Sequence, residues 1–132
     1  MKKKILISTG GSGGHVMPAI TIQDHLKIEY DILISTDLRG LKYLQNNTYK
    51  IVIVDTPKLN NIIFLPFAFI KIFFLIIKSL FLLKKEKIKI LISTGGYMSL
   101  PLCLAAKILN IKIFLIEPNM VIGRANKFFL NF

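Results

Sequence analysis

Short apolar runs that end in small polar residues recur along the chain. The heptapeptide Ile-Leu-Ile-Ser-Thr-Gly-Gly occupies residues 5–11 and returns at 90–96, and its first five residues occur again at 32–36. Two further apolar runs cover residues 51–54 and 111–116. Continuous β-branched runs of this length are typical of parallel strands that are buried on both faces. The pattern therefore predicts five strands of a parallel sheet.

The segments between these runs have helical patterns. Helices are predicted at residues 17–28, 38–46, 66–85 and 99–109, with a further helix beginning at Gly123. Alternating strands and helices predict an α/β fold, a Rossmann-like doubly wound parallel sheet with its functional site at the carboxyl ends of the strands. An α+β domain with some antiparallel pairing is the alternative.

Residues 1–132 amount to one ordinary domain. No glycine stop or polar tail follows the last predicted helix, so we expect an incomplete domain, either a fragment or a truncated product. The apolar run after Lys4 ends after three residues, which is too short for a signal peptide. We therefore expect a cytosolic first strand.

The longest apolar stretch covers residues 62–83. Lys71, Lys78 and Lys85 recur in and after it at intervals of seven, which places them along one stripe of a helix. Three interpretations remain open: an interfacial helix whose lysines reach lipid phosphates, a buried crossover helix with solvated lysines, and a transmembrane span. Two lysines inside the stretch oppose the span, because each costs about 2.5–3.5 kcal/mol at the bilayer centre.

The net charge of the chain and the kinds of basic residue it contains indicate which class of binding partner to expect. Eighteen Lys and Arg oppose seven Asp and Glu, for a net charge of +11, yet only Arg39 and Arg124 are arginines. Base-reading surfaces favour the guanidinium group, so we expect no nucleic-acid partner and favour an anionic membrane surface or a phosphorylated ligand. Cys103 is the single cysteine, which excludes a disulfide within the chain and a cysteine metal site.

The first candidate site is a glycine-rich loop after the first strand. Backbone without side chains lets N–H groups approach a ligand, and the following helix, with Pro18 in its first turn, adds the positive end of its dipole. A phosphate is therefore the expected ligand, although neither nucleotide-binding glycine pattern fits. The alternative is a turn that only lets strand and helix pack closely. The loop residues are Gly10, Gly11, Ser12, Gly13 and Gly14.

His15 ends this loop at the mouth of the predicted sheet. An imidazole there can take a proton from an attacking hydroxyl or donate to a phosphate. A capping or packing role is the alternative, and both stay open.

A second glycine loop follows the fourth predicted strand, at the same edge of the sheet. It contains Gly95, Gly96 and Tyr97, and Ser99 is positioned to cap the next helix. Binding and capping are both open roles for Ser99.

A third loop follows the fifth predicted strand. Glu117 comes directly after an apolar run and is followed by Asn119 and Asn126. A carboxylate at this position is either functional or ties down its loop.

Together the three loops resemble those of the MurG family of N-acetylglucosaminyltransferases. The resemblance covers the whole chain but only that family's N-terminal, acceptor-binding domain. The first two loops match its glycine loops. The third has the Glu, Asn, Gly and Asn of its motif, but Ile116 and Pro118 stand where the family usually has His and Gln.

The resemblance implies the N-terminal half of a GT-B glycosyltransferase, without the donor-binding C-terminal domain. The implied reaction is inverting transfer of GlcNAc from UDP-GlcNAc to the MurNAc 4-hydroxyl of undecaprenyl-pyrophosphoryl-MurNAc-pentapeptide, lipid I to lipid II, in peptidoglycan synthesis. His15 and Glu117 are the implied catalytic residues, with no metal or other cofactor. The implied substrate-binding residues are those of the two glycine loops together with Asn119 and Asn126.

The resemblance also implies a peripheral protein on the cytoplasmic face of the cell membrane. The alternative function is a membrane-bound recruiting subunit of a split polyprenyl-linked GlcNAc transferase. Because no donor-binding domain is present, we expect little or no transferase activity from this chain alone.

Overall fold

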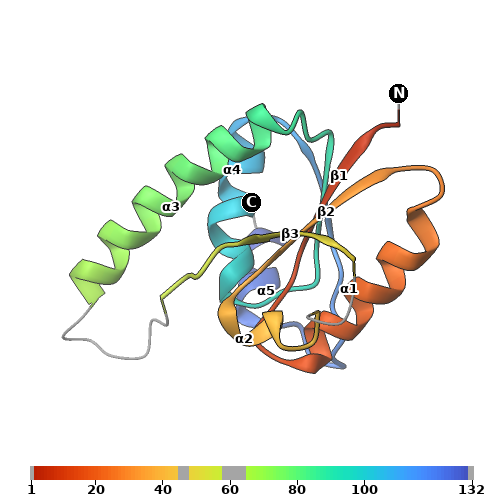
Figure 1. Ribbon diagram of the computed structural model, residues 1–132. Coiled ribbons are helices and arrows are strands. Elements are labelled where there is room, and N and C mark those ends of the chain that lie inside the picture. The colour runs from red at the N-terminus through yellow and green to blue at the C-terminus, as the bar shows by residue number, and fades with distance from the viewer. Residues whose placement is uncertain (1, 45–47, 58–64, 131–132) are drawn as a thin grey trace.

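The computed structural model describes residues 2–44, 48–57 and 65–130, and all structural statements here concern these ranges. One sheet has the strand order β3-β2-β1-β4-β5, and each neighbouring pair is parallel (Figure 1). This is the order of a doubly wound sheet, and the predicted α/β fold is confirmed. The strands are β1 (Lys4–Ser8), β2 (Asp31–Thr36), β3 (Lys50–Ile53), β4 (Ile90–Ser93) and β5 (Lys112–Leu115).

The repeated sequence occupies three neighbouring strands in register. Ile5 of β1 pairs with Ile32 of β2 and with Ile90 of β4, and the following Leu, Ile and Ser of the three strands pair likewise. Identical residues therefore form rows across the centre of the sheet, with leucines on one face and isoleucines on the other. Both faces are buried here, as the apolar runs predict.

The two edge strands are less buried than predicted. β3 exposes Lys50 and Ile53, and β5 exposes Lys112 and Phe114. The expectation of burial on both faces is wrong for these two strands. An apolar run does not reveal whether a strand lies at the centre or at an edge, because the fold decides how many neighbours each strand has.

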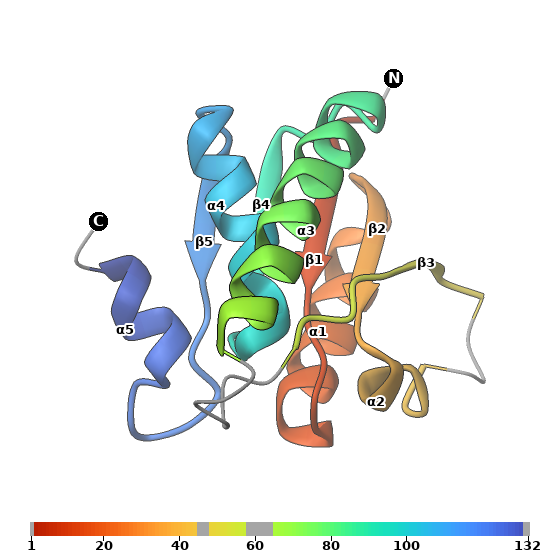
Figure 2. The same cartoon turned by 90° about the vertical axis from the view of Figure 1, so that its left-hand side faces the viewer.

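Helices cover both faces of the sheet (Figure 2). One face packs on α1, and the other packs on α3 and α4. A short 3₁₀ helix, η2, precedes α4 and was not predicted, and residues 45 and 46 of the predicted second helix lie outside the described ranges. The helices are α1 (Gly13–Leu26), α2 (Leu38–Leu41), α3 (Leu65–Lys85), η2 (Tyr97–Ser99), α4 (Leu100–Ile108) and α5 (Arg124–Leu130).

Helix α1 begins earlier than predicted. The N–H groups of His15 and Val16 donate to the carbonyl of Ser12 at 3.1 and 3.2 Å, so Gly13, Gly14 and His15 form the first turn instead of the end of a loop. Pro18 consequently lies inside the helix, and its predicted place in the first turn is wrong. Glycine's low helix propensity points to a later start, but here the tertiary structure overrides that propensity.

Helix α3 carries most of the long apolar stretch. It buries Ile72, Ser79 and Leu83 against the rest of the molecule and exposes the three lysines of the predicted stripe. Within the described ranges, no helix combines the length and the hydropathy that a membrane crossing needs. Residues 62–64 of the stretch lie outside the described ranges.

Candidate functional site

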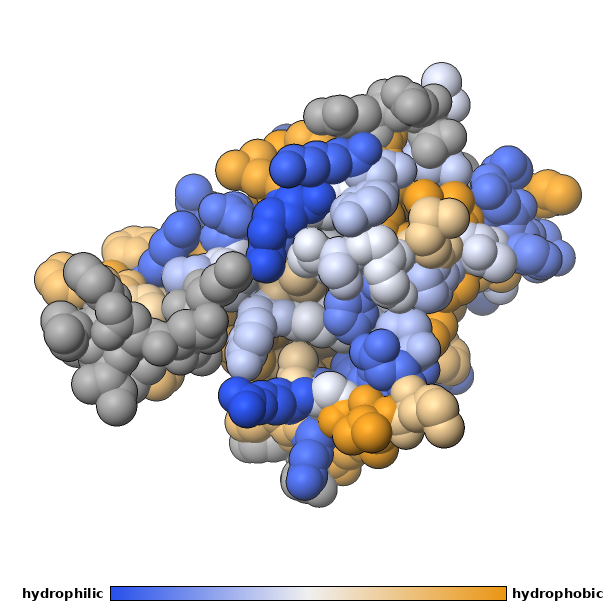
Figure 3. Space-filling view, turned by 90° about the horizontal axis from the view of Figure 1, so that it is seen from below, coloured by the Kyte–Doolittle hydropathy of each residue, from blue (hydrophilic) through white to orange (hydrophobic). Residues whose placement is uncertain are grey.

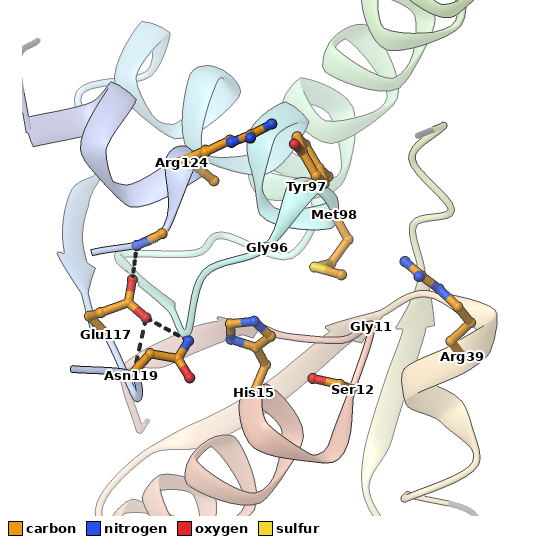
Figure 4. Close-up of a pocket in the computed structure, with 12 residues that line it drawn as sticks. Gly11, Ser12, His15, Arg39, Gly96, Tyr97, Met98, Glu117, Asn119 and Arg124 are labelled. Carbon is orange, nitrogen blue, oxygen red and sulfur yellow. Dashed lines mark hydrogen bonds between the residues drawn. The ribbon is translucent and has the colours of Figure 1, made fainter. Parts of the chain in front are cut away.

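The three candidate loops meet at the carboxyl ends of β1, β4 and β5. β1 and β4 are neighbours where the strand order reverses, and ligands of doubly wound sheets bind at this point. A cavity of about 360 Å³ opens there (Figure 4). Seen from below, hydrophilic and near-neutral residues occupy the middle of this face, and both hydrophobic and hydrophilic residues lie at its margin (Figure 3).

Seven predicted residues from all three loops line this cavity. They are Gly11, Ser12, His15, Gly96, Tyr97, Glu117 and Asn119. The other predicted residues of the three loops are not part of the lining: Gly10, Gly13, Gly14, Gly95, Ser99 and Asn126.

Both arginines of the chain line this same cavity, and sequence reasoning missed them. Arg39 comes from α2 and Arg124 from the start of α5, and they lie on opposite sides of the cavity (Figure 4). Their scarcity was an available signal, because sixteen of the eighteen basic residues are lysines and both exceptions follow a strand's carboxyl end. Met98 of the lining was also missed.

His15 is held by a backbone carbonyl. Its Nδ1 lies 2.7 Å from the carbonyl oxygen of Thr94. Because a carbonyl oxygen only accepts, we assign the proton to Nδ1, which leaves Nε2 with a free lone pair. The ring belongs to the cavity wall, so it is oriented as a proton acceptor.

Asp37, a buried residue not predicted for the site, anchors the first loop. Its Oδ1 accepts the N–H groups of Gly11 and Gly40, each at 2.8 Å, and its Oδ2 accepts Nε of Arg39 at 2.9 Å. Burial raises the pKa of Asp37, but the donors from Gly11, Gly40 and Arg39 outweigh it, so the pKa lies below its ordinary value. The same carboxylate thus holds the loop and one of the two arginines.

Gly10 has the packing role that the sequence left open for this loop. Its φ is +146°, and a Cβ there would lie 2.6 Å from Oδ1 of Asp37. Only glycine therefore fits beside that carboxylate. The loop both packs closely, through Gly10, and lines the cavity, through Gly11 and Ser12.

In the second loop, Ser99 does not cap α4 as predicted. It stands at the N-cap position without a side-chain capping bond, and its Oγ instead donates to the carbonyl of Gly96 at 2.7 Å. Ser99 is itself part of η2 with helical backbone angles, so its side chain reaches back along that turn. The bond fixes Gly96, whose φ of +86° suits glycine.

Glu117 organises the third loop. Oε1 accepts the backbone and side-chain N–H groups of Asn119 at 3.2 and 3.0 Å, and Oε2 accepts Gly123 N–H at 2.7 Å and Asn126 Nδ2 at 3.1 Å. The Gly123 bond, followed by those from the asparagines, lowers the pKa of Glu117. The structure thus shows the loop-tying role that the sequence left open for it.

No metal centre is evident in the part of the chain that the structure describes, because no three His, Cys, Asp or Glu side chains gather there. The thiol of Cys103 is buried, and burial raises its pKa to about 12. A thiol with that pKa is a poor nucleophile at neutral pH. The side chains in the lining of the cavity that carry a charge or an imidazole ring are His15, Arg39, Glu117 and Arg124.

Known proteins share this architecture. The family model described as the glycosyltransferase family 28 N-terminal domain matches residues 5–132. The chain belongs to this family. A relative from Pelagibacter ubique (strain HTCC1062) is named UDP-N-acetylglucosamine–N-acetylmuramyl-(pentapeptide) pyrophosphoryl-undecaprenol N-acetylglucosamine transferase. It is 56% identical over 133 residues, which cover 100% of this chain and 37% of the relative.

A second relative and a solved structure match the same part of the family. A relative with the same name from Wolbachia sp. subsp. Brugia malayi (strain TRS) is 38% identical over 96% of this chain and 36% of its own length. The crystal structure of Acinetobacter baumannii MurG matches with a TM-score of 0.83 and 25% identity, over 98% of this chain and 39% of that one. The chain thus corresponds to the N-terminal part of MurG proteins and spans less than two fifths of their length.

Proposed function

We propose that this chain forms the acceptor-binding part of an inverting N-acetylglucosaminyltransferase. The donor is UDP-GlcNAc, and the acceptor is the MurNAc 4-hydroxyl of undecaprenyl-pyrophosphoryl-MurNAc-pentapeptide. The product is lipid II for peptidoglycan synthesis, and hence for cell growth and division. Family membership and the names of the relatives support this reaction.

The observation that carries the proposal is the pairing of both arginines across one glycine-lined cavity. Arginine is the side chain best suited to phosphate oxygens. Ser12, the N-cap of α1, and His15 in its first turn both line the cavity, so the positive end of the α1 dipole lies at its wall. The one carboxylate in the lining, Glu117, already accepts four hydrogen bonds. The cavity thus suits a pyrophosphate.

His15 is the proposed general base. Its Nε2 takes the proton of the acceptor's 4-hydroxyl while that oxygen bonds to C1 of GlcNAc. The bond from C1 to the UDP oxygen breaks on the opposite face, UDP leaves with the electron pair, and the configuration at C1 is inverted. Glu117 is a positioning residue for Asn119 in this scheme, because its low pKa makes it a weak base.

Helix α3 is the proposed membrane contact. Its three stripe lysines are exposed, and a phenylalanine stands four residues before each of them. These side chains, Phe67, Phe74 and Phe81, expose 72%, 60% and 71% of their surface. A helix face with exposed aromatics beside lysines suits the headgroup region of an anionic bilayer. The protein is therefore proposed to bind the cytoplasmic face of the cell membrane peripherally.

A fusion protein tests the reaction. This chain replaces the matching first 37% of the Pelagibacter relative, and transfer of labelled GlcNAc from UDP-GlcNAc to lipid I is measured. We expect turnover by the fusion and little or none by the chain alone. In the fusion, Arg39→Ala and Arg124→Ala should each raise the acceptor KM about tenfold, because a hydrogen bond to a charged group is worth about 1.5–3 kcal/mol.

Lys42→Ala, an exposed lysine of the same region outside the cavity, is the control and should change neither constant. Turnover by the chain alone contradicts the proposed division of labour. A folded fusion that binds UDP-GlcNAc but transfers nothing to lipid I contradicts the proposed reaction.

A further inference from the structure

A second cavity of about 530 Å³ lies against the first, and its character is the opposite. It opens between the N-terminal half of α3, the start of α4 and α5. Aromatic and branched aliphatic side chains form most of its wall, among them Phe69, Ile72, Phe73, Ile76, Leu100 and Leu104. Its size lies within the range of small-molecule sites, and its wall is of the type that buries an apolar group.

The two cavities share part of their walls. Tyr97, Arg124 and Ala125 line both of them. Figure 4 shows Tyr97 and Arg124 next to each other on the side of the first cavity that faces α4. Arg124 is the one charged residue in the lining of the second cavity. A guanidinium group therefore stands where the polar cavity meets the apolar one.

This apolar cavity is separate from the proposed membrane-contacting face of α3. Its four α3 residues, at 69, 72, 73 and 76, follow the i, i+3, i+4, i+7 spacing of one helix face. Phe67, Phe74 and Phe81, which accompany the lysines, follow a spacing of seven on the other side of the helix. Phe73 and Phe74 are adjacent and expose 61% and 60% of their surface, yet they point to different faces.

A ligand that fills both cavities must have an anionic part in the polar cavity and an adjacent apolar part in the second cavity. A nucleotide sugar or a soluble sugar phosphate satisfies the polar cavity only. We propose that the apolar cavity binds the phosphate-proximal part of the hydrocarbon chain of a polyprenyl pyrophosphate, with the pyrophosphate held at Arg124. This inference rests on the proposed function, because it takes the polar cavity as the pyrophosphate site.

In this arrangement the protein binds the phosphate-proximal part of the substrate's hydrocarbon chain, and only the rest of that hydrocarbon chain stays in the bilayer. The branched methyl groups along a polyprenyl chain suit a wall of Phe, Ile and Leu side chains. Burying their apolar area there contributes favourably to the free energy of binding. The hydrocarbon chain thereby contributes to recognition of the acceptor, and an acceptor with a pyrophosphate but no hydrocarbon binds more weakly.

Two soluble probes test the proposal by calorimetry on the 132-residue chain in buffer without detergent or vesicles. The probes are inorganic pyrophosphate and farnesyl pyrophosphate, a short polyprenyl pyrophosphate. Farnesyl pyrophosphate should bind at least tenfold more tightly, equivalent to about 1.4 kcal/mol. Phe73→Ser should remove this gain and leave pyrophosphate binding unchanged. Phe74→Ser, the matched control that loses the same ring contact between the two phenylalanines, should keep it.

Equal affinity for the two probes, or equal effects of the two substitutions, overturns the apolar cavity as the chain site while leaving the pyrophosphate site intact. Binding of neither probe overturns both this inference and the anion site of the proposed function. Both phenylalanines are more exposed than buried, so both variants should fold, which thermal unfolding checks.

Discussion

At the scale of single residues, the site depends on hydrogen bonds that orient its groups. The carbonyl of Thr94 sets the proton of His15 on Nδ1, and so presents Nε2 as an acceptor. The carboxylate of Asp37 joins the first glycine loop to Arg39. Thr94 lies 79 residues from His15, and Asp37 lies 26 residues from Gly11, so both of these contacts form only in the folded state.

Replacing His15 tests its role as a base. In the fusion enzyme, His15→Ala should lower kcat by about 10²–10⁴-fold, the usual contribution of a positioned base, with little change in the KM for UDP-GlcNAc. His25→Ala is the control, because His25 is exposed on the same helix and also has its Nδ1 on a backbone carbonyl, that of Thr21. If His15→Ala leaves both constants unchanged, His15 only packs.

Replacing Asp37 tests its role as an anchor. Its pKa is lowered in the folded protein, so its hydrogen bonds stabilise the fold fully above the unfolded-state pKa of about 3.9, and this contribution is lost as pH falls through the folded-state pKa. Asp37→Asn should lower the free energy of unfolding at pH 7 by about 1.5–3 kcal/mol. Urea unfolding from pH 7 down to pH 3 should show the difference from the wild type shrinking.

The control for this series is Asp24→Asn, because the ion pair of Asp24 with Lys27 is exposed on α1 and such pairs contribute little. A deficit of Asp37→Asn that is the same at every pH would mean that the carboxylate's charge has no part in the anchor.

At the scale of elements, α3 has three faces with different roles. One side packs into the core, one lines the apolar cavity, and one exposes phenylalanines beside lysines. Its N-terminal half lies out beyond the sheet (Figure 1) and carries most of the α3 residues of the apolar cavity, whereas the face with phenylalanines and lysines runs along the whole helix. A long apolar run in sequence is therefore not one hydrophobic surface but several.

Charge reversal on this helix tests its membrane role. Lys71→Glu/Lys78→Glu should weaken binding to anionic vesicles at least tenfold, because each lysine near the surface contributes about 1 kcal/mol and 1.4 kcal/mol is a factor of ten. Co-sedimentation at low and high salt measures this, and high salt should release the wild type. Lys3→Glu/Lys42→Glu makes the same change in net charge at exposed positions outside α3 and should retain binding.

Three other results of that assay are distinct. No co-sedimentation of the wild type means that α3 is only a crossover helix. Release by detergent alone means that the protein is integral. Salt-sensitive binding that survives the reversal of Lys71 and Lys78 removes the lysine stripe from the contact.

At the scale of the whole molecule, the strand order creates the site. The loops after β1 and β4 lie side by side only because the chain crosses over from the β3 edge to the other side of β1. Arg39 follows β2 and Arg124 follows β5, on either side of that pair. One polar cavity thus collects groups from four strand ends, which span residues 11–125.

The sequence by itself determined the α/β class and the central strands. The Ile-Leu-Ile-Ser run at three places encodes burial on both faces, and these strands are neighbours in register. The glycine loops and the Glu117 motif also correctly indicated that the site lies at the carboxyl ends of the strands. Such features are local, because they depend on side-chain type and spacing within a few residues.

Only the tertiary structure decided which groups meet. It brought Arg39 and Arg124 to one cavity, used both oxygens of Glu117 on its own loop, and turned Ser99 back toward Gly96. It also left β3 and β5 at the edges, where one strand neighbour is missing. These outcomes depend on contacts between residues far apart along the chain, and on competition among donors for one acceptor, which no local pattern records.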